Sequence, residues 1–217
     1  MPSSPLNQPG HDCPLCPRLA AFRATWRAAE PTWFNAPVPV FEPKDQSRPA
    51  RLLVVGLAPG LRGANRTGRP FTGDYAGDLL YATLREFGFA TGAYEARPDD
   101  GLALVDTRIV NAVRCVPPEN KPTTPEIRTC RAFLAPMITA VPGLMAVVTL
   151  GKIAHDSTVS ALGARPAHHR FGHGARSRIG SLEVFSSYHC SRYNTNTGVL
   201  TPDMFRAVFR AVRAYLD

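Results

Sequence analysis

The chain has 217 residues, 44% hydrophobic and 19% charged, a composition that excludes a disordered chain and supports one domain with a full core. Its net charge of +8 favours a polyanionic partner such as nucleic acid. Residues 1–10 lack the basic and apolar segments of a secretory signal, and no apolar run reaches membrane-spanning length. We therefore expect one domain over residues 1–217, loose in residues 1–10, that works as a cytoplasmic monomer away from membranes.

Four cysteines form two pairs that lie far apart in the chain. Two residues separate Cys13 from Cys16, 98 residues follow, and 14 residues separate Cys115 from Cys130. Four thiolates brought together form a closed zinc or iron–sulfur site, and the spacing alone does not separate the two. Buried small residues or a disulfide pair are the alternatives, but a reducing cytosol favours a metal. Cys190 lies in a different motif, so we expect it to be a free thiol.

Apolar periodicity predicts strands that alternate with helices. A helix is expected over residues 13–29, before an irregular proline-rich segment. The expected strands cover 51–56, 107–113, 145–150 and 182–188. The expected helices cover 79–87, 124–140 (with Thr124 as N-cap), 151–162 and 202–216, and a loop covers 163–180. This order predicts a three-layer α/β/α fold with a central, mostly parallel four-stranded sheet that binds its ligand at the carboxyl ends of the strands.

The loop after the first strand is rich in glycine and arginine. Five glycines between residues 56 and 73 let the backbone approach a flat or anionic ligand, but their spacing matches neither the dinucleotide fingerprint nor the phosphate P-loop. Arg62, Arg66 and Arg69 are expected to form a basic rim. Phe71 is either a core residue or a platform for a planar ring. Asp74 is either the N-cap of the next helix or a functional carboxylate.

Two further loops at the same sheet edge carry dense polar chemistry. Asn111 has both a donor and an acceptor and so can read a base edge, although it can also satisfy a local backbone group. Lys121, in the loop that follows, is a phosphate contact or plain surface. Residues 188–196 hold one His, one Arg, two Tyr and two Asn. His189 in this position favours catalysis over a structural role, and Tyr193 with Arg192 is expected to wedge into a base stack.

Four ordered motifs and the four cysteines together resemble the uracil-DNA glycosylase superfamily over almost the whole chain. The motifs are Gly-Leu-Ala-Pro-Gly at 56–60, Asn-Arg-Thr-Gly-Arg-Pro-Phe-Thr-Gly-Asp at 65–74, Asn-Ala-Val-Arg-Cys at 111–115 and His-Cys-Ser-Arg-Tyr-Asn at 189–194. The chain is most similar to family 5 (type b), the iron–sulfur enzymes. Family 4 has an acidic residue after the first Gly and a His-Pro-Ser motif, whereas this chain has Leu57, Ala58 and Cys190 there.

The resemblance implies base excision repair: removal of uracil, and of deaminated purines such as hypoxanthine, from double-stranded DNA. It implies a structural [4Fe–4S] cluster on the four paired cysteines. Asp74 is then the catalytic carboxylate, Asn111 the reader of the uracil edge, Phe71 the stacking ring and His189 the stabiliser of the leaving group. The expected pocket residues are Gly56, Ala58, Pro59, Gly60, Phe71, Asn111 and His189, and the expected DNA contacts are Arg62, Arg66, Lys121, Arg192, Tyr193 and Asn194. The competing hypothesis is a nucleic-acid-binding module stapled by metal and without catalysis.

Overall fold

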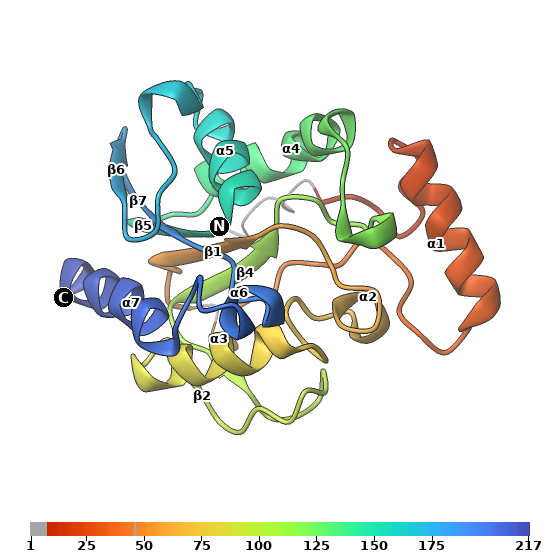
Figure 1. Ribbon diagram of the computed structural model, residues 1–217, viewed down its shortest axis with the longest axis horizontal. Coiled ribbons are helices and arrows are strands. Elements are labelled where there is room, and N and C mark those ends of the chain that lie inside the picture. Colours follow the sequence, from red (N-terminus) through yellow and green to blue (C-terminus); the bar gives the residue numbers. More distant parts are fainter. Residues whose placement is uncertain (1–7, 46) are drawn as a thin grey trace.

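The computed structural model describes residues 8–45 and 47–217 and is built around a five-stranded sheet (Figure 1). The strand order is β4-β1-β5-β7-β6. The mostly parallel arrangement expected from the sequence is confirmed, because β1, β4, β5 and β7 run parallel to their neighbours and only β6 runs antiparallel to β7. The strands are β1 Leu52–Gly56, β4 Thr107–Asn111, β5 Ala146–Leu150, β6 Arg176–Ile179 and β7 Leu182–Ser187.

The prediction of four strands was wrong by one edge strand. We expected residues 163–180 to be a loop, but Arg176–Ile179 pairs with β7. This strand carries two exposed arginines and only one buried residue, so it lacks the apolar run that marks the inner strands. An exposed, charged edge strand is a common way to prevent pairing with other chains, and it leaves little signal in the sequence.

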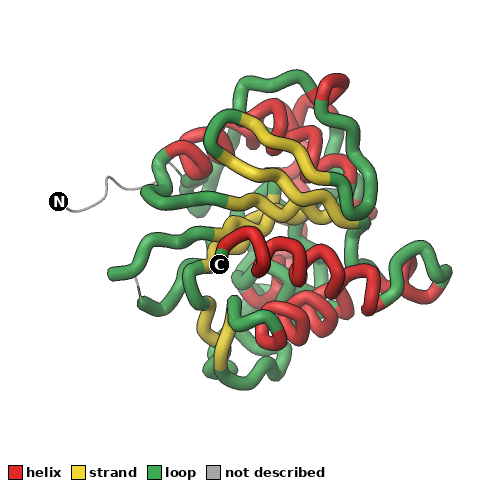
Figure 2. Tube along the Cα trace, turned by 90° about the vertical axis from the view of Figure 1, so that its left-hand side faces the viewer, coloured by secondary structure: helices red, strands yellow, loops and turns green. Residues whose placement is uncertain are grey.

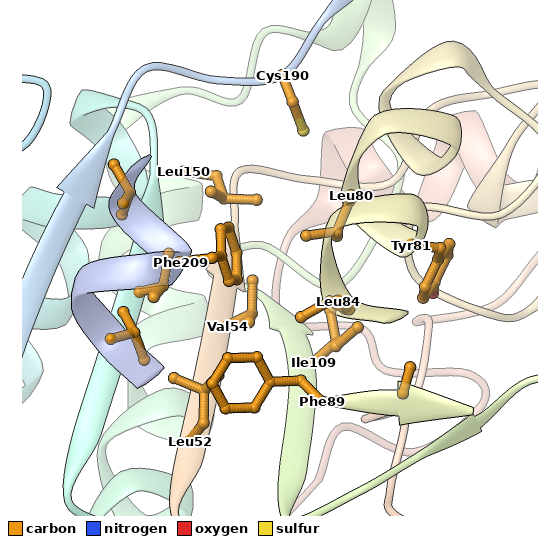
Figure 3. Close-up of a cluster of buried hydrophobic side chains, with 14 of the residues drawn as sticks. Leu52, Val54, Leu80, Tyr81, Leu84, Phe89, Ile109, Leu150, Cys190 and Phe209 are labelled. Carbon is orange, nitrogen blue, oxygen red and sulfur yellow. The ribbon is translucent and has the colours of Figure 1, made fainter. Parts of the chain in front are cut away.

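Helices cover both faces of the sheet, as a parallel sheet requires (Figure 2). Helices α3 (Tyr75–Glu86) and α7 (Pro202–Leu216) pack on one face, and α4 (Thr124–Thr139) and α5 (Lys152–Ala161) pack on the other. Alternate residues of β1 serve the two cores: Leu52 and Val54 face α3 and α7, while Leu53 and Val55 face α4 and α5. Figure 3 shows the core on the α3/α7 face of the sheet, with Phe209 of α7 on one side and Leu80 of α3 on the other.

The helix ends differ from the sequence prediction by a few residues. The N-cap of α4 is Thr123, not Thr124, because Thr123 forms a capping box with Glu126. Helix α3 begins four residues before the predicted start, directly after Asp74, whose side chain accepts a hydrogen bond from the first turn. Helix α1 (Pro17–Ala29) begins after Cys16 rather than at Cys13.

Shorter elements complete the fold. They are α2 (Ala64–Thr67), α6 (Arg192–Asn196), the 3-10 turns Pro118–Asn120 and Pro166–His168, and a small sheet of β2 (Ala90–Thr91) and β3 (Ala103–Leu104). The polar segment after β7 is therefore partly helical rather than a plain loop, because Ser191 caps α6. No helix in the described part of the chain is long and apolar enough to span a membrane.

Candidate functional site

A cavity of about 700 Å³ opens where the parallel strands end. Its walls come from the segments after β1, β4 and β7 and from the start of α3, which are far apart in the sequence. The volume lies in the range of small-molecule sites. Ala58, Pro59 and Gly60 line the wall that follows β1. The carboxyl edge of the sheet thus brings together segments that are separate in the chain, as expected for this class of fold.

Gly56 lies behind the cavity wall rather than in it, and its role is to leave room for two side chains. A Cβ at this position would lie 2.4 Å from Asn111 Oδ1 and 2.4 Å from Phe71 Cζ, too close for any side chain. Asn111 ends β4, is only 4% exposed and lines the cavity together with Phe71. We predicted that the Gly56 backbone approaches a ligand closely. In the structure Gly56 instead packs against the side chains of Asn111 and Phe71.

Asp74 is both a helix cap and a wall of the cavity. Its Oδ1 accepts a hydrogen bond from the Gly77 backbone N–H at 3.3 Å. Its Oδ2 faces two glycines. A Cβ added at Gly60 would lie 2.9 Å from Asp74 Oδ2, and a Cβ added at Gly63 would lie 2.5 Å from it. Burial raises the pKa of the Asp74 carboxyl, against the opposing effect of the Gly77 hydrogen bond. A raised pKa makes this carboxylate a stronger base than an exposed one.

His189 follows β7 and reaches the same cavity. Its ring stacks on Phe71 with the ring centroids 6.0 Å apart. Burial lowers the pKa of His189 to about 4, so the imidazole is neutral at pH 7 and carries one N–H that can donate a hydrogen bond. The Asn194 side chain donates to the His189 carbonyl at 2.8 Å and so fixes the backbone here.

The turn around Phe71 is held from outside the cavity. Phe71 has a left-handed φ of 53°, which is strained for an aromatic residue. The Tyr94 hydroxyl donates to the Phe71 carbonyl at 3.2 Å and accepts from Gly73 N at 3.5 Å. The Tyr81 hydroxyl donates to the Pro70 carbonyl at 2.5 Å. The two tyrosines therefore hold the backbone from Pro70 to Gly73, on both sides of Phe71.

Arg69 corrects one expectation, because it is buried rather than part of a basic rim. It is 6% exposed and donates to both carboxylate oxygens of Asp100, at 2.9 and 2.7 Å. Its Nε donates to Thr72 Oγ1 at 2.7 Å. The Arg69 guanidinium holds the pKa of Asp100 well below its usual range, although burial acts in the opposite direction. This paired ion fixes the turn to a second loop, and a charge pattern alone does not reveal it.

The predicted DNA contacts separate into two groups. Arg62 and Arg192 line the cavity, and the Arg192 guanidinium lies over the Tyr75 ring at 5.5 Å. Tyr193, on α6, is 73% exposed. Arg62 and Arg192 therefore lie in the cavity wall, and Tyr193 follows Arg192 on the same short helix.

The remaining predicted contacts lie outside the cavity. Arg66 is exposed and borders a separate groove with Phe34 and Arg97. Lys121 is exposed and lies 3.5 Å from a Glu119 carboxylate oxygen. Asn194 supports His189, as described above. Arg66 and Lys121 are therefore exposed outside the cavity, and their contact with DNA stays a prediction.

Three polar side chains of the cavity were not singled out from the sequence. Tyr75, Asn120 and Ser191 all line the cavity. Each lies next to a residue or motif that was singled out, but no spacing rule marks it. Asn120 also has a left-handed φ of 56°. Asparagine adopts this conformation more readily than most residues, and its place at the cavity wall is seen only in the structure.

The four paired cysteines line one small cavity on the side of α1. Cys13 and Cys16 precede the helix, Cys115 follows β4, and Cys130 lies on α4. Burial raises the pKa of Cys115 to about 11 and that of Cys130 to about 12. A bound cation would displace those protons. Cys190 is elsewhere, fully buried in the α3/α7 core with its Sγ 3.5 Å from the Ala76 carbonyl (Figure 3).

Comparison with known proteins places these features in context. The family model of the Uracil DNA glycosylase superfamily matches residues 43–213. The Type-5 uracil-DNA glycosylase of Thermus thermophilus is 43% identical over 203 residues, which cover 90% of each chain. That of Pyrobaculum aerophilum is 37% identical over 207 residues, 94% of this chain and 88% of its own. That of Mycobacterium tuberculosis is 39% identical over 211 residues, 93% of this chain and 77% of its own.

Proposed function

The chain belongs to the uracil DNA glycosylase superfamily, and from this premise we propose that it excises uracil from double-stranded DNA by hydrolysing the N-glycosidic bond. One observation carries the proposal for this chain: Asp74, Asn111 and His189, from three distant segments, line a single cavity. One chain supplies all of these side chains, so a monomer suffices. We also propose a cytoplasmic location, because a reducing compartment would keep the cysteines out of disulfide bonds.

Recognition requires the base to leave the duplex, because its edge and its glycosidic bond are inaccessible inside the stack. In the cavity the base would stack on the Phe71 ring, while the Asn111 carboxamide pairs with its edge. A buried carboxamide left unpaired by a wrong base is costly, which gives discrimination. The volume of about 700 Å³ and the small Ala58 also support acceptance of larger deaminated purines such as hypoxanthine.

Cleavage separates charge between the sugar and the base. The C1′–N bond breaks with its electron pair leaving on the base, and the oxygen of a water molecule bonds to C1′. Neutral His189 donates a hydrogen bond to the base oxygen where negative charge develops. Asp74, with its raised pKa, stabilises the positive sugar and accepts the proton of the attacking water. We thus propose opposite electrostatic roles for Asp74 and His189, which both line the cavity.

DNA engagement is supported by charge and by one exposed aromatic side chain. The net charge of +8 and the side chains of Arg62, Arg66, Lys121 and Arg192 favour phosphate contacts. Tyr193 is available to fill the gap that the base leaves in the stack. Asn194 stays a predicted DNA contact, and its side-chain amide also donates a hydrogen bond to the His189 carbonyl.

The cysteine cavity supports the proposed [4Fe–4S] cluster. All four cysteines line it, and a buried donor, Arg23 Nε, has no protein partner there. Tetrahedral zinc would hold its sulfurs within about 3.8 Å of one another. Within residues 8–45 and 47–217, however, no three His, Cys, Asp or Glu side chains are grouped closely enough to hold a metal ion. The proposal of a cluster therefore rests on the four cysteines that line one cavity and on the resemblance to the iron–sulfur family, not on the spacing of the sulfurs. Such a centre would supply a cross-link between α1, β4 and α4.

The test separates a glycosylase from a binding module without catalysis. We compare the unmodified protein with Asp74→Asn on a duplex that carries one uracil, and measure single-turnover release of free uracil and DNA affinity. Asparagine is also a good N-cap, so α3 should be preserved. We expect a loss of about 10² to 10⁴ in rate with little change in affinity. The exposed Asp78→Asn serves as the matched control. An unmodified protein that binds the duplex but releases no uracil would establish the binding module instead.

A further inference from the structure

Two buried arginines flank the cysteine cavity without a carboxylate partner. Arg23 on α1 is 4% exposed, Arg114 after β4 is 3% exposed, and both line the cavity. In the described part of the chain, no salt bridge within 4.0 Å includes either residue. The nearby Glu126 pairs with Arg18 instead, at 2.7 Å. These two guanidinium groups are thus distinct from the buried Arg69, which has a carboxylate of its own.

All hydrogen-bond partners of the two side chains are neutral groups. Arg23 Nη1 donates to Cys115 Sγ at 3.3 Å, its Nη2 donates to the Cys13 carbonyl at 3.0 Å, and its buried Nε has no partner. Arg114 Nε donates to the Val38 carbonyl at 2.6 Å. The Arg114 backbone N–H donates to Cys130 Sγ at 3.3 Å. With four protonated thiols, Arg23 would have no anionic group within salt-bridge distance, and Arg114 would have only the more distant Glu42 carboxylate, which forms its salt bridge with Arg108.

Charge balance indicates what the cavity is built to hold. An unpaired buried ion costs several kcal/mol even after relaxation. A metal centre with a core charge of about +2 on four thiolates carries a net charge of about −2, which the two guanidinium groups would neutralise. We propose that Arg23, with Arg114, is the built-in counter-charge of an anionic tetrathiolate centre and raises both its retention and its reduction potential. The inference rests on the metal centre proposed above and goes beyond it by assigning roles to residues that are not ligands.

The Arg23 contact predicts a specific electrochemical signature. A reduced centre is more negative than an oxidised one, so a nearby positive charge favours reduction. The hydrogen bond to Cys115 Sγ acts in the same direction, because donors to a ligand sulfur tune the potential of the centre. Removal of the charge should therefore make the potential more negative, whereas an arginine that only fills space would leave it unchanged.

The experiment compares Arg23→Gln and Arg23→Lys with the unmodified full-length protein, purified without oxygen. Arg128→Gln is the matched control, because it removes an exposed positive charge on α4 close to Cys130. Iron, zinc and acid-labile sulfide are assayed first. The midpoint potential is then titrated with dithionite, and metal loss to a chelator is timed. We expect Arg23→Gln to reduce the equilibrium constant for reduction at least tenfold, a shift of about 59 mV, and to lose metal at least tenfold faster. Lysine, which keeps the charge, should restore both values.

The outcomes separate this inference from the proposals on which it rests. If the centre is present and Arg23→Gln behaves like Arg128→Gln, the counter-charge role is wrong while the centre stands. If the unmodified protein holds neither iron nor zinc, the centre and the inference both fall, and uracil release by the same sample reports separately on catalysis. If the metal is zinc, which has no redox chemistry, the rate of metal loss alone tests the counter-charge role of Arg23. If Arg23→Gln does not fold, Arg114→Gln carries the same comparison, because its guanidinium flanks the same cavity.

Discussion

Two cavities are joined by one stretch of chain but differ in almost every physical respect. The base cavity is lined by Asp74, Asn111 and His189, and the cysteine cavity is lined by the four paired cysteines. Asn111 at the end of β4 lines the first, and Cys115, four residues later, lines the second. The base cavity offers about 700 Å³, and its lining combines neutral polar groups, the Asp74 carboxylate and the arginines Arg62 and Arg192. The cysteine cavity is narrow and combines buried thiols with buried cations. The difference teaches that one region suits a ligand that comes and goes, and the other suits a resident group.

The largest effect should come from removal of a cysteine ligand. Cys130→Ser should abolish metal retention and lower the free energy of unfolding by several kcal/mol, because the cross-link of α4 to α1 and β4 is lost. Cys190→Ala removes an equally buried thiol outside that cavity and should keep the full metal content. Metal analysis and denaturant unfolding of both variants provide the measurement. Full metal content in Cys130→Ser would remove Cys130 from the proposed ligands.

Loss of the base-reading amide should affect specificity rather than stability. Asn111→Ala should lower uracil release about 100-fold and narrow the preference for uracil over the normal pyrimidines, because the paired contacts to the base edge are lost. Its metal content should stay unchanged, in contrast to Cys130→Ser. Single-turnover rates on uracil and on matched normal duplexes measure this. Unchanged discrimination would mean that Asn111 only packs against Phe71.

The lowered pKa of His189 predicts a pH-dependent difference in stability. The pKa of His189 is lowered to about 4 in the folded protein and is near 6.5 when unfolded. Between these values the unfolded state binds the extra proton, so stability falls as pH decreases through this window, by about 2 to 3 kcal/mol in total. Glutamine does not titrate, so the free energy of unfolding of His189→Gln should decrease less over the same pH range. Denaturant unfolding of both proteins from pH 7 to pH 4 measures the difference, and parallel curves would exclude a neutral, buried imidazole.

The smallest effect concerns the outer support of the base cavity. Tyr94→Phe keeps the ring but removes the hydroxyl that joins the Phe71 carbonyl to Gly73 N. The loss of about one hydrogen bond should slow uracil release about tenfold with little change in DNA affinity. Tyr215→Phe, which removes a hydroxyl bonded to Arg178 on another part of the surface, is the matched control. Equal rates for the two variants would show that the Phe71 turn holds itself.

The sequence predicted the alternating strands and helices and the cavity side chains. It did not predict the residues outside the cavity that hold the Phe71 turn in place. Asp74 precedes a helix, Asn111 is the last residue of a strand and His189 follows a strand, so a parallel sheet had to bring them to one edge. Asp100 and Tyr94 lie in a loop without periodicity, and they reach the Phe71 turn only through tertiary contacts across more than 20 residues. Such contacts leave no local pattern.

Charge raised a similar difficulty, because the sequence does not distinguish a solvated arginine from a buried one. Arg62 lines the cavity, Arg66 is exposed, and Arg69 is buried against Asp100, although all three belong to one short basic segment. The same applies to Arg23, whose position beside Cys115 depends on the packing of α1 against the end of β4. Burial, which decides the role of each arginine, comes from the tertiary fold.

The most direct test of the central claim is to identify which free bases the unmodified protein releases. Duplexes carrying a single uracil, hypoxanthine or xanthine, and matched duplexes with normal bases only, are incubated with the protein, and the released bases are separated and quantified. The account predicts free uracil and free hypoxanthine, an intact sugar-phosphate strand at each abasic site, and no release of normal bases. Absence of any free base from every duplex, with DNA still bound, would contradict it.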